Sequence, residues 1–175
     1  GVLTTLGRVF EQAGHELSLV GGPVRDALLG RFAKAEADLD FTTDAHPDAV
    51  LALLEPVAET TWDVGIRFGT IGARVGGREV EITTYRAEAY DPESRKPQVD
   101  FGTRLDEDLV RRDFTINAMA IRLPSLELVD LFGGRADLAA GVIRTPGTPH
   151  DSFSDDPLRM MRAARFSAQL GFEVE

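Results

Sequence analysis

The sequence predicts a mixed α/β (α+β) fold over residues 1–145, followed by the start of a second, helical domain over residues 146–175. Three observations favour this division. Short apolar runs of strand length alternate with segments of helical spacing through the first part, and glycine or proline marks most of the junctions. A stretch rich in Pro, Gly and Ser then covers residues 146–154. Beyond it one strong helical pattern fills residues 155–170, and because a single helix cannot bury a core alone, we expect it to begin a further domain.

The first elements follow from apolar spacing and from the residues that end each run. A helix is predicted over residues 3–13, where apolar residues recur at helical spacing before Gly14. The run at 17–20 predicts a short buried strand. Pro23 suits the first turn of the next helix, because an N–H at that position would have no helical partner, and Gly30 ends that helix.

The rest of the first domain alternates in the same way. The segment 90–97 (YDPESRKP) is polar and rich in breakers, which predicts a mobile loop. Gly76-Gly77 is a favourable two-residue hairpin turn. The predicted elements are a strand at 37–42, a helix at 47–54, hairpin strands at 71–74 and 79–84, a helix at 105–110, hairpin strands at 117–123 and 126–131, a helix at 135–140 and a strand at 142–145.

Composition limits the classes of function. Apolar residues make up 43% of the chain, which favours a folded protein, and there are 19 basic against 29 acidic residues, a net charge of −10. This balance argues against a domain that coats nucleic acid through general basicity, although a local basic cleft remains possible. The chain has no cysteine, which excludes disulfides, thiolate metal sites and cysteine nucleophiles. We find no run of transmembrane length and no signal-peptide pattern, so we expect a soluble cytoplasmic protein without a membrane partner.

The first candidate site lies at a strand–glycine–helix junction. Gly21 and Gly22 follow the strand at 17–20, and Arg25 lies in the first turns of the next helix. Backbone N–H groups and the helix dipole favour an anion at such a junction, and arginine binds phosphate in a bidentate manner.

The second candidate site is an Asp-x-Asp pattern in the following strand. Asp38 and Asp40 would project from the same face while Leu39 turns into the core. Two neighbouring carboxylates repel unless a cation neutralises them, and oxygen ligands alone select a hard cation such as Mg²⁺. The alternative is that Asp38 caps a turn and Asp40 is solvated.

Glu79 and Glu81 likewise share one face of a strand, so either carboxylate could join the metal site. A carboxylate cluster that holds two Mg²⁺ ions is the usual apparatus for phosphoryl or nucleotidyl transfer. The alternative for both residues is a solvent-facing strand edge, and for Glu79 we prefer that alternative.

Two arginine-rich segments follow. RRDFTINAMA (residues 111–120) places Arg112 and Asp113 at an expected helix start, where they either bind a ribose or phosphate or form a surface ion pair. In the helix at 155–170, residues at steps of three could line one side of a cleft that binds a triphosphate, or could form a solvated charged face. These four residues are Asp156, Arg159, Arg162 and Arg165.

Other reaction types lack their signatures. The chain has no G-x-x-x-x-G-K-[ST] and no G-x-G-x-x-G motif, so P-loop and Rossmann sites are not predicted. It has no G-x-S-x-G motif, and its three histidines show no metal-ligand spacing.

Taken together, these motifs resemble those of the tRNA nucleotidyltransferase / poly(A) polymerase family, and more narrowly of the bacterial-type CCA-adding enzymes within the polymerase-β-like nucleotidyltransferase superfamily. The matching segments occur in the family's order between residue 19 and about residue 170. They are LVGGPVRDALLGR, ADLDFTT, VEITTYR, RRDFTINAMA and DDPLRMMRAARF.

The resemblance implies a catalytic head domain followed by a helical neck, with Mg²⁺ at a two-metal site. It implies that Asp38 and Asp40 hold the metal and that Glu81 stands where the family has a third catalytic carboxylate. The residues implied to bind the nucleotide are Gly21, Gly22, Arg25, Arg112, Asp113, Asp156, Arg159, Arg162 and Arg165.

The implied reaction is transfer of CMP or AMP from CTP or ATP to the 3′ end of a tRNA, with release of pyrophosphate. Family members select the base with an E-D-x-x-R type motif on a later neck helix, and this chain has no such motif. A poly(A) polymerase, an enzyme restricted to adding CC or A, and a non-catalytic module that binds Mg-nucleotide therefore remain alternatives. The sequence predicts no oligomeric state.

Overall fold

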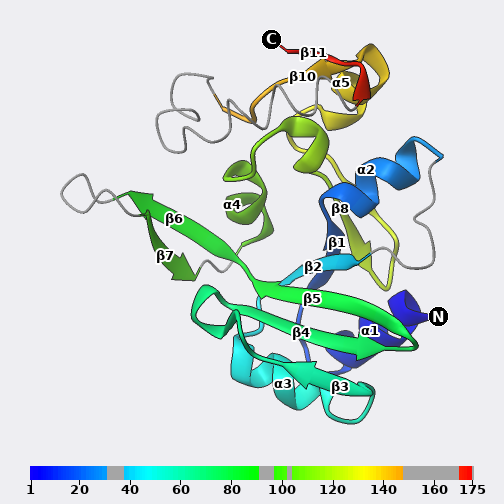
Figure 1. Ribbon diagram of the computed structural model, residues 1–175, viewed down its shortest axis with the longest axis vertical. Helices are drawn as coiled ribbons and strands as arrows, with labels where there is room; N and C mark the ends of the chain where they lie inside the picture. Colours follow the sequence, from blue (N-terminus) through cyan, green and yellow to red (C-terminus); the bar gives the residue numbers. More distant parts are fainter. Residues whose placement is uncertain (31–37, 91–96, 102–103, 148–169, 175) are drawn as a thin grey trace.

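The computed structural model describes residues 1–30, 38–90, 97–101, 104–147 and 170–174 (Figure 1). Its centre is a seven-stranded sheet with the strand order β3-β4-β5-β2-β1-β8-β9. The strands β2 and β5 are parallel, and every other neighbouring pair in this sheet is antiparallel. The mixed α/β fold predicted from the sequence is thereby confirmed.

The strands that were predicted begin and end within three residues of the expected positions. The strands of the central sheet are β1 (Leu17–Val20), β2 (Leu39–Thr43), β3 (Thr60–Trp62), β4 (Thr70–Val75), β5 (Arg78–Thr84), β8 (Ala120–Leu123) and β9 (Leu128–Val129). Two further pairs lie outside it, β6 (Arg86–Tyr90) with β7 (Pro97–Phe101), and β10 (Val142–Ile143) with β11 (Glu173–Val174).

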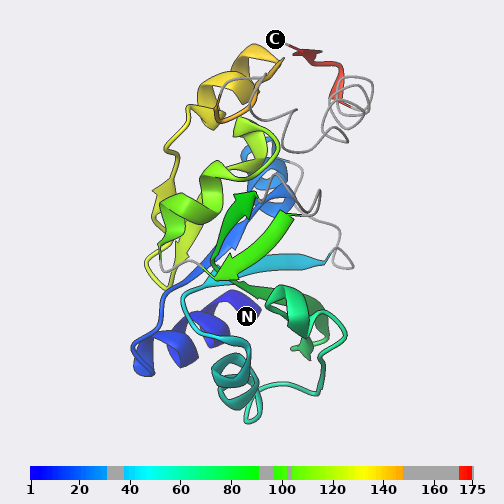
Figure 2. The ribbon, with the colours of Figure 1, turned by 90° about the vertical axis from the view of Figure 1, so that its left-hand side faces the viewer.

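Helices cover both faces of the sheet, as Figures 1 and 2 show. On one face α1 (Val2–Gln12) and α3 (Pro47–Leu54) pack against alternate residues of the strands, including Leu19 and Phe41, to form the main core. On the other face α4 (Leu105–Val110) packs against a smaller cluster that includes Val20. Because Leu19 and Val20, neighbours on β1, belong to opposite clusters, both faces of this inner strand are buried.

The helix α2 (Gly22–Leu28) begins where β1 ends, as expected for the strand–glycine–helix junction. Near it lies a third apolar cluster, built from the 3₁₀ helix η2 (Thr115–Asn117), α5 (Gly134–Ala140), β10 and the segment 170–174. Residues before and after position 145 thus pack together. The domain boundary at that position stays a prediction, and of the helix expected at 155–170 only Leu170 is described.

Three local expectations differ from the structure. The edge strand β3 and the hairpin β6–β7 were not predicted, and this hairpin flanks the expected loop, of which residues 91–96 lie outside the described residues. The segment 111–120 does not start an α-helix: it bends, forms η2 and enters β8. The physical reason is that Asp113 Oδ1 accepts the N–H of Phe114 at 2.8 Å, a local bond that competes with helical hydrogen bonding.

A short 3₁₀ helix, η1 (Ile66–Phe68), joins β3 to β4. Within the described ranges, no helix is both long enough and apolar enough to cross a membrane.

Candidate active site

Two carboxylates meet in the middle of the sheet. Asp40 on β2 and Glu81 on β5 are direct partners across the parallel pair, so their side chains leave the same face at neighbouring positions. Asp40 is half-buried and Glu81 is exposed. Asp38, also exposed, lies immediately before β2, which begins at Leu39 and not at residue 37 as expected.

The electrostatics of Asp40 identify the groups around it. The pKa of Asp40 is raised from 3.8 to about 6, chiefly by burial and then by the charge of Glu81, while Arg112 opposes the shift and Asp38 adds a smaller contribution to it. Charged groups from three separate sequence motifs therefore act on Asp40 at this place. Glu79 is exposed, pairs across the sheet with Arg74 and does not contribute to this shift, so the geometry favours Glu81 as the third carboxylate.

The glycine turn brings arginines to the same place. Gly21 has φ +74° and ψ −141°, a conformation open almost only to glycine, and it directs the chain from β1 into α2. A Cβ on Gly21 would lie 3.8 Å from Arg112 Nη1, and one on Gly22 would lie 3.5 Å from Arg25 Nη2. Because β1 is antiparallel to β2, this turn lies beside the start of β2 and hence beside the carboxylates.

Arg25 and Asp113 belong to one buried hydrogen-bonded network. Arg25 Nη1 donates to Asn117 Oδ1 at 3.0 Å, and Asn117 Nδ2 donates to Asp113 Oδ1 at 3.1 Å. Arg25 Nε also donates to Asp26 Oδ1 at 3.0 Å. The first and fourth sequence motifs are therefore one structural unit. The sequence reasoning did not single out Asn117, although an amide four residues after Asp113 in a buried motif is a signal that could have found it.

Asp108 is a further residue that the sequence reasoning missed. It is fully buried on α4, and its carboxylate accepts hydrogen bonds from Arg112 Nη2 at 3.0 Å, Arg111 Nη2 at 3.2 Å and the backbone N–H of Arg86 at 3.0 Å. Burial by itself raises the pKa of Asp108, but Arg112 and Arg111 outweigh it and hold that pKa below its usual value. An aspartate beside Leu109, with arginines three and four residues later, is the signal in the sequence.

The residues present fit a hard divalent cation by the chemistry of their donors. Asp38, Asp40 and Glu81 offer only carboxylate oxygens, the ligand type that Mg²⁺ prefers. Over the described part of the chain no three acidic or histidine side chains already converge as a metal centre. The raised pKa of Asp40 is the expected behaviour of a buried carboxylate whose negative neighbours are not balanced by a cation.

The predicted contribution of the later helix lies outside the described residues. Asp156, Arg159, Arg162 and Arg165 all fall in the undescribed range 148–169, so their part in the site stays a prediction. The other predicted site residues gather around the glycine turn and the start of β2.

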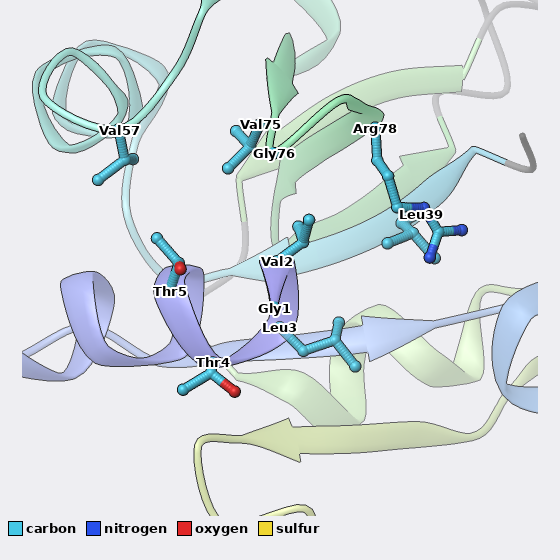
Figure 3. A pocket seen from close by; sticks show the side chains of 10 residues that line it. All are labelled: Gly1, Val2, Leu3, Thr4, Thr5, Leu39, Val57, Val75, Gly76 and Arg78. Atoms are coloured by element: carbon cyan, nitrogen blue, oxygen red, sulfur yellow. The ribbon is translucent and has the colours of Figure 1, made fainter. Parts of the chain in front are cut away.

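A pocket of about 860 Å³ opens between the start of α1 and the turn after β4 (Figure 3). Its lining is mostly apolar and includes Val2, Val75 and Leu39. Leu39 immediately precedes Asp40 on β2, so the two side chains point to opposite faces of the sheet. The pocket therefore lies across the sheet from the carboxylates.

The described arrangement can bind a cation and an anion side by side. Carboxylates stand on one side of the glycine turn, and the guanidinium groups of Arg25 and Arg112 lie against the turn itself. A metal-bound polyphosphate carries both charges, and its phosphates would meet arginine while its metal meets carboxylate.

Comparison with known proteins agrees with this chemistry. Residues 17–144 match the family described as the poly(A) polymerase head domain. A CCA-adding enzyme of Lactobacillus helveticus is 47% identical over 169 residues, which are 96% of this chain and 40% of that protein. The chain thus spans about two fifths of the length of this relative.

Solved structures give the same answer for the fold. The Bacillus stearothermophilus CCA-adding enzyme in complex with CTP superposes with a TM-score of 0.85 at 38% identity, over 99% of this chain and 40% of the other. The Thermotoga maritima CCA-adding enzyme complexed with tRNA superposes with a TM-score of 0.77 at 32% identity, over 99% and 38% of the two chains.

Proposed function

Because the chain belongs to the poly(A) polymerase head-domain family, we propose that it is the catalytic head of a template-independent RNA nucleotidyltransferase of the CCA-adding type. The reaction is transfer of CMP or AMP from CTP or ATP to the 3′ end of a tRNA, with release of pyrophosphate. The observation that carries the proposal is the Asp40–Glu81 pair beside Arg112 and the glycine turn. The relatives named above, one bound to CTP and one to tRNA, support these substrates. For an enzyme that acts on tRNA we propose a cytoplasmic location.

We assign the divalent cations, proposed to be two Mg²⁺ ions, to Asp38 and Asp40, with Glu81 as the third catalytic carboxylate. When bound, such ions lower the pKa of the attacking hydroxyl and neutralise charge on the phosphates. The carboxylates would hold the positive charge of these ions beside the glycine turn. Because Asp40 is half-buried, its carboxylate is restricted in position.

The nucleotide is assigned to the other side of the same turn. Gly21 and Gly22 let the backbone approach the triphosphate without a side chain in between, and Arg25 and Arg112 bind its phosphates. Asp113 orients Arg25 through Asn117 and is proposed to serve the ribose. Asp156, Arg159, Arg162 and Arg165 are proposed to complete the nucleotide site.

A poly(A) polymerase is the second candidate, since the matching family carries that name. An enzyme that adds only CC or only A, and a module that binds Mg-nucleotide without catalysis, are the remaining ones. None of the described residues selects the base in our assignment, so this choice is left to a functional assay.

The deciding experiment incubates the full-length protein with a tRNA that lacks its 3′-terminal CCA, with CTP and ATP supplied separately and together. CCA addition predicts incorporation of C from CTP alone and of a single A only after C. Long A tracts from ATP alone would instead indicate a poly(A) polymerase. Binding of Mg-ATP without pyrophosphate release on any RNA would overturn catalysis.

Stabilisation by Mg²⁺ should depend on pH. Because the folded-state pKa of Asp40 is raised to about 6, protonation of Asp40 stabilises the fold fully below pH 3.8, and this contribution is lost as the pH rises through about 6. Mg²⁺ competes with that proton for the ionised carboxylate. The Mg²⁺-induced rise in melting temperature, measured with CTP present, should therefore be large at about pH 7.5 and small at about pH 5. An equal rise at both pH values, or none, would contradict the metal assignment.

A further inference from the structure

Arg112 depends on a single residue for its position. Among the residues that the structure describes, the only hydrogen-bond or ion-pair partner of its guanidinium is Asp108, whose Oδ2 accepts from Arg112 Nη2 at 3.0 Å. The side chain of Arg112 is 19% exposed, and its Nε is buried without a hydrogen bond. No second anchor in this part of the molecule would therefore hold the guanidinium if Asp108 released it.

Arg112 also lies next to carboxylates that it could bind instead. Its Nη1 is 3.8 Å from the position of a Cβ on Gly21, and the Gly21 turn lies beside the start of β2. The charge of Arg112 acts on Asp40, and Asp38 and Glu81 act on the same carboxylate. A released guanidinium would meet these negative groups first.

We propose that Asp108 is a positioning residue that holds Arg112 on the nucleotide side of the turn and keeps it from pairing with the carboxylates that are to bind the divalent cation. This rests on the proposed function, because it takes Asp40 to be a metal ligand. Asp108 would thereby keep the guanidinium of Arg112 away from the carboxylates that bind the divalent metal ion.

The surroundings of Asp108 hold its carboxylate in one position. It is fully buried, and besides Arg112 it binds Arg111 and the backbone N–H of Arg86, which fixes its carboxylate from three sides. Its helix α4 is anchored by Leu105 and Leu109 in the cluster on this face of the sheet. A carboxylate fixed in this way can hold a guanidinium at one point, whereas an exposed ion pair could not.

Asp108→Asn tests the proposal with little change of shape. The amide retains an oxygen for the Arg86 N–H, but its NH₂ group cannot accept a hydrogen bond from Arg112. Binding of Mn²⁺, as a probe for Mg²⁺, is measured by electron paramagnetic resonance on the full-length protein without nucleotide or RNA. The Kd for Mn²⁺ should rise at least about tenfold and at most about 10³-fold, the upper figure being the one expected when a cation moves to within about 4 Å of a carboxylate at an effective dielectric constant of about 20.

Asp106→Asn is the matched control. It lies on the same helix, removes the same charge and breaks only the exposed pair with Arg104, so its Kd for Mn²⁺ should equal that of the wild type. An Asp108→Asn protein that binds Mn²⁺ as tightly as the wild type would overturn the proposal. A wild type that binds no Mn²⁺ would instead overturn the metal site of the proposed function.

Arg112→Gln distinguishes positioning from a general structural role. If Asp108 acts through Arg112, adding Asp108→Asn to Arg112→Gln should leave the Kd for Mn²⁺ unchanged. A further weakening in the double variant would show that Asp108 acts in another way and would overturn the proposal. The comparison between Arg112→Gln and the double variant also serves if Asp108→Asn alone does not fold. The double variant should fold more readily, because it does not leave the guanidinium of Arg112 buried without a partner.

Discussion

Asp40→Asn is expected to lower nucleotide incorporation by the full-length protein at least about 10³-fold, the scale of several kcal/mol of charge stabilisation. The amide has nearly the shape of the carboxylate but lacks the charge that a divalent cation requires. Single-turnover incorporation on a tRNA without its 3′ end is the direct measurement, because it separates the chemical step from release of the product.

The free energy of unfolding of Asp40→Asn shows whether a loss of nucleotide incorporation comes from the site or from unfolding of the protein. The raised pKa of Asp40 means that its ionised form is unfavourable in the fold at neutral pH without a cation. The Asn variant should therefore unfold no more easily than the wild type, and without Mg²⁺ it should be more stable by about 1–3 kcal/mol.

Two glutamates of β5 provide a second test and its matched control. Glu81→Gln removes the partner of Asp40 and should also reduce incorporation strongly, whereas Glu79→Gln removes an exposed carboxylate paired across the sheet with Arg74 and should have little effect. Equal losses in the two variants would contradict the choice of Glu81. Retention of more than about a tenth of the activity by Asp40→Asn would contradict the metal assignment itself.

Gly134→Ala is expected to lower the free energy of unfolding by about 2–3 kcal/mol, because there is no room for the methyl group. A Cβ at this buried position would collide with the carbonyl oxygen of Thr115 and lie 2.9 Å from Met119 Cγ. Thr115 opens η2, so the displacement should spread to Asn117, which holds Arg25. Urea denaturation should show the lower stability, and nucleotide binding should weaken with it.

Gly147→Ala is the control for that change. A Cβ on Gly147 meets nothing within 4 Å, and its backbone is not in the left-handed region, so the substitution should leave stability nearly unchanged. A Gly134→Ala protein as stable as the Gly147→Ala protein would show that α5 can move away from η2 without cost.

The sequence predicted Asp40 better than it predicted its partner. Alternation along a strand is a local property, so it places Asp38 and Asp40 toward one face without knowledge of the fold. The same rule puts Glu79 and Glu81 on a common face and cannot choose between them. The choice depends on the register of a parallel pair that joins residues 41 positions apart, Asp40 and Glu81, and only the folded sheet contains it.

Asp108 was missed for a related reason. In the sequence it is one of several acidic residues in a short helix, an arrangement typical of a solvent-facing surface. Its burial results from the meeting of Arg111 and Arg112 with the backbone of Arg86, more than 20 residues earlier in the chain. The strand β3 was missed because it has only three residues, and β6 and β7 were missed because the adjoining segment 90–97 is polar and rich in breakers, which obscures their short alternation.

The place of β1 in the sheet has a consequence for the synthesis of the chain. One neighbour of β1, β2, leaves the ribosome soon after it, but the other is β8, whose Ala120 pairs with Val20 a hundred positions away. At about 5–20 residues per second, β1 waits for this second partner for roughly 5–20 s. During that time an apolar strand has one edge open to wrong partners. Arg112 is made just before β8, so the nascent protein gains the second partner of β1 and the arginine beside the Gly21 turn almost together.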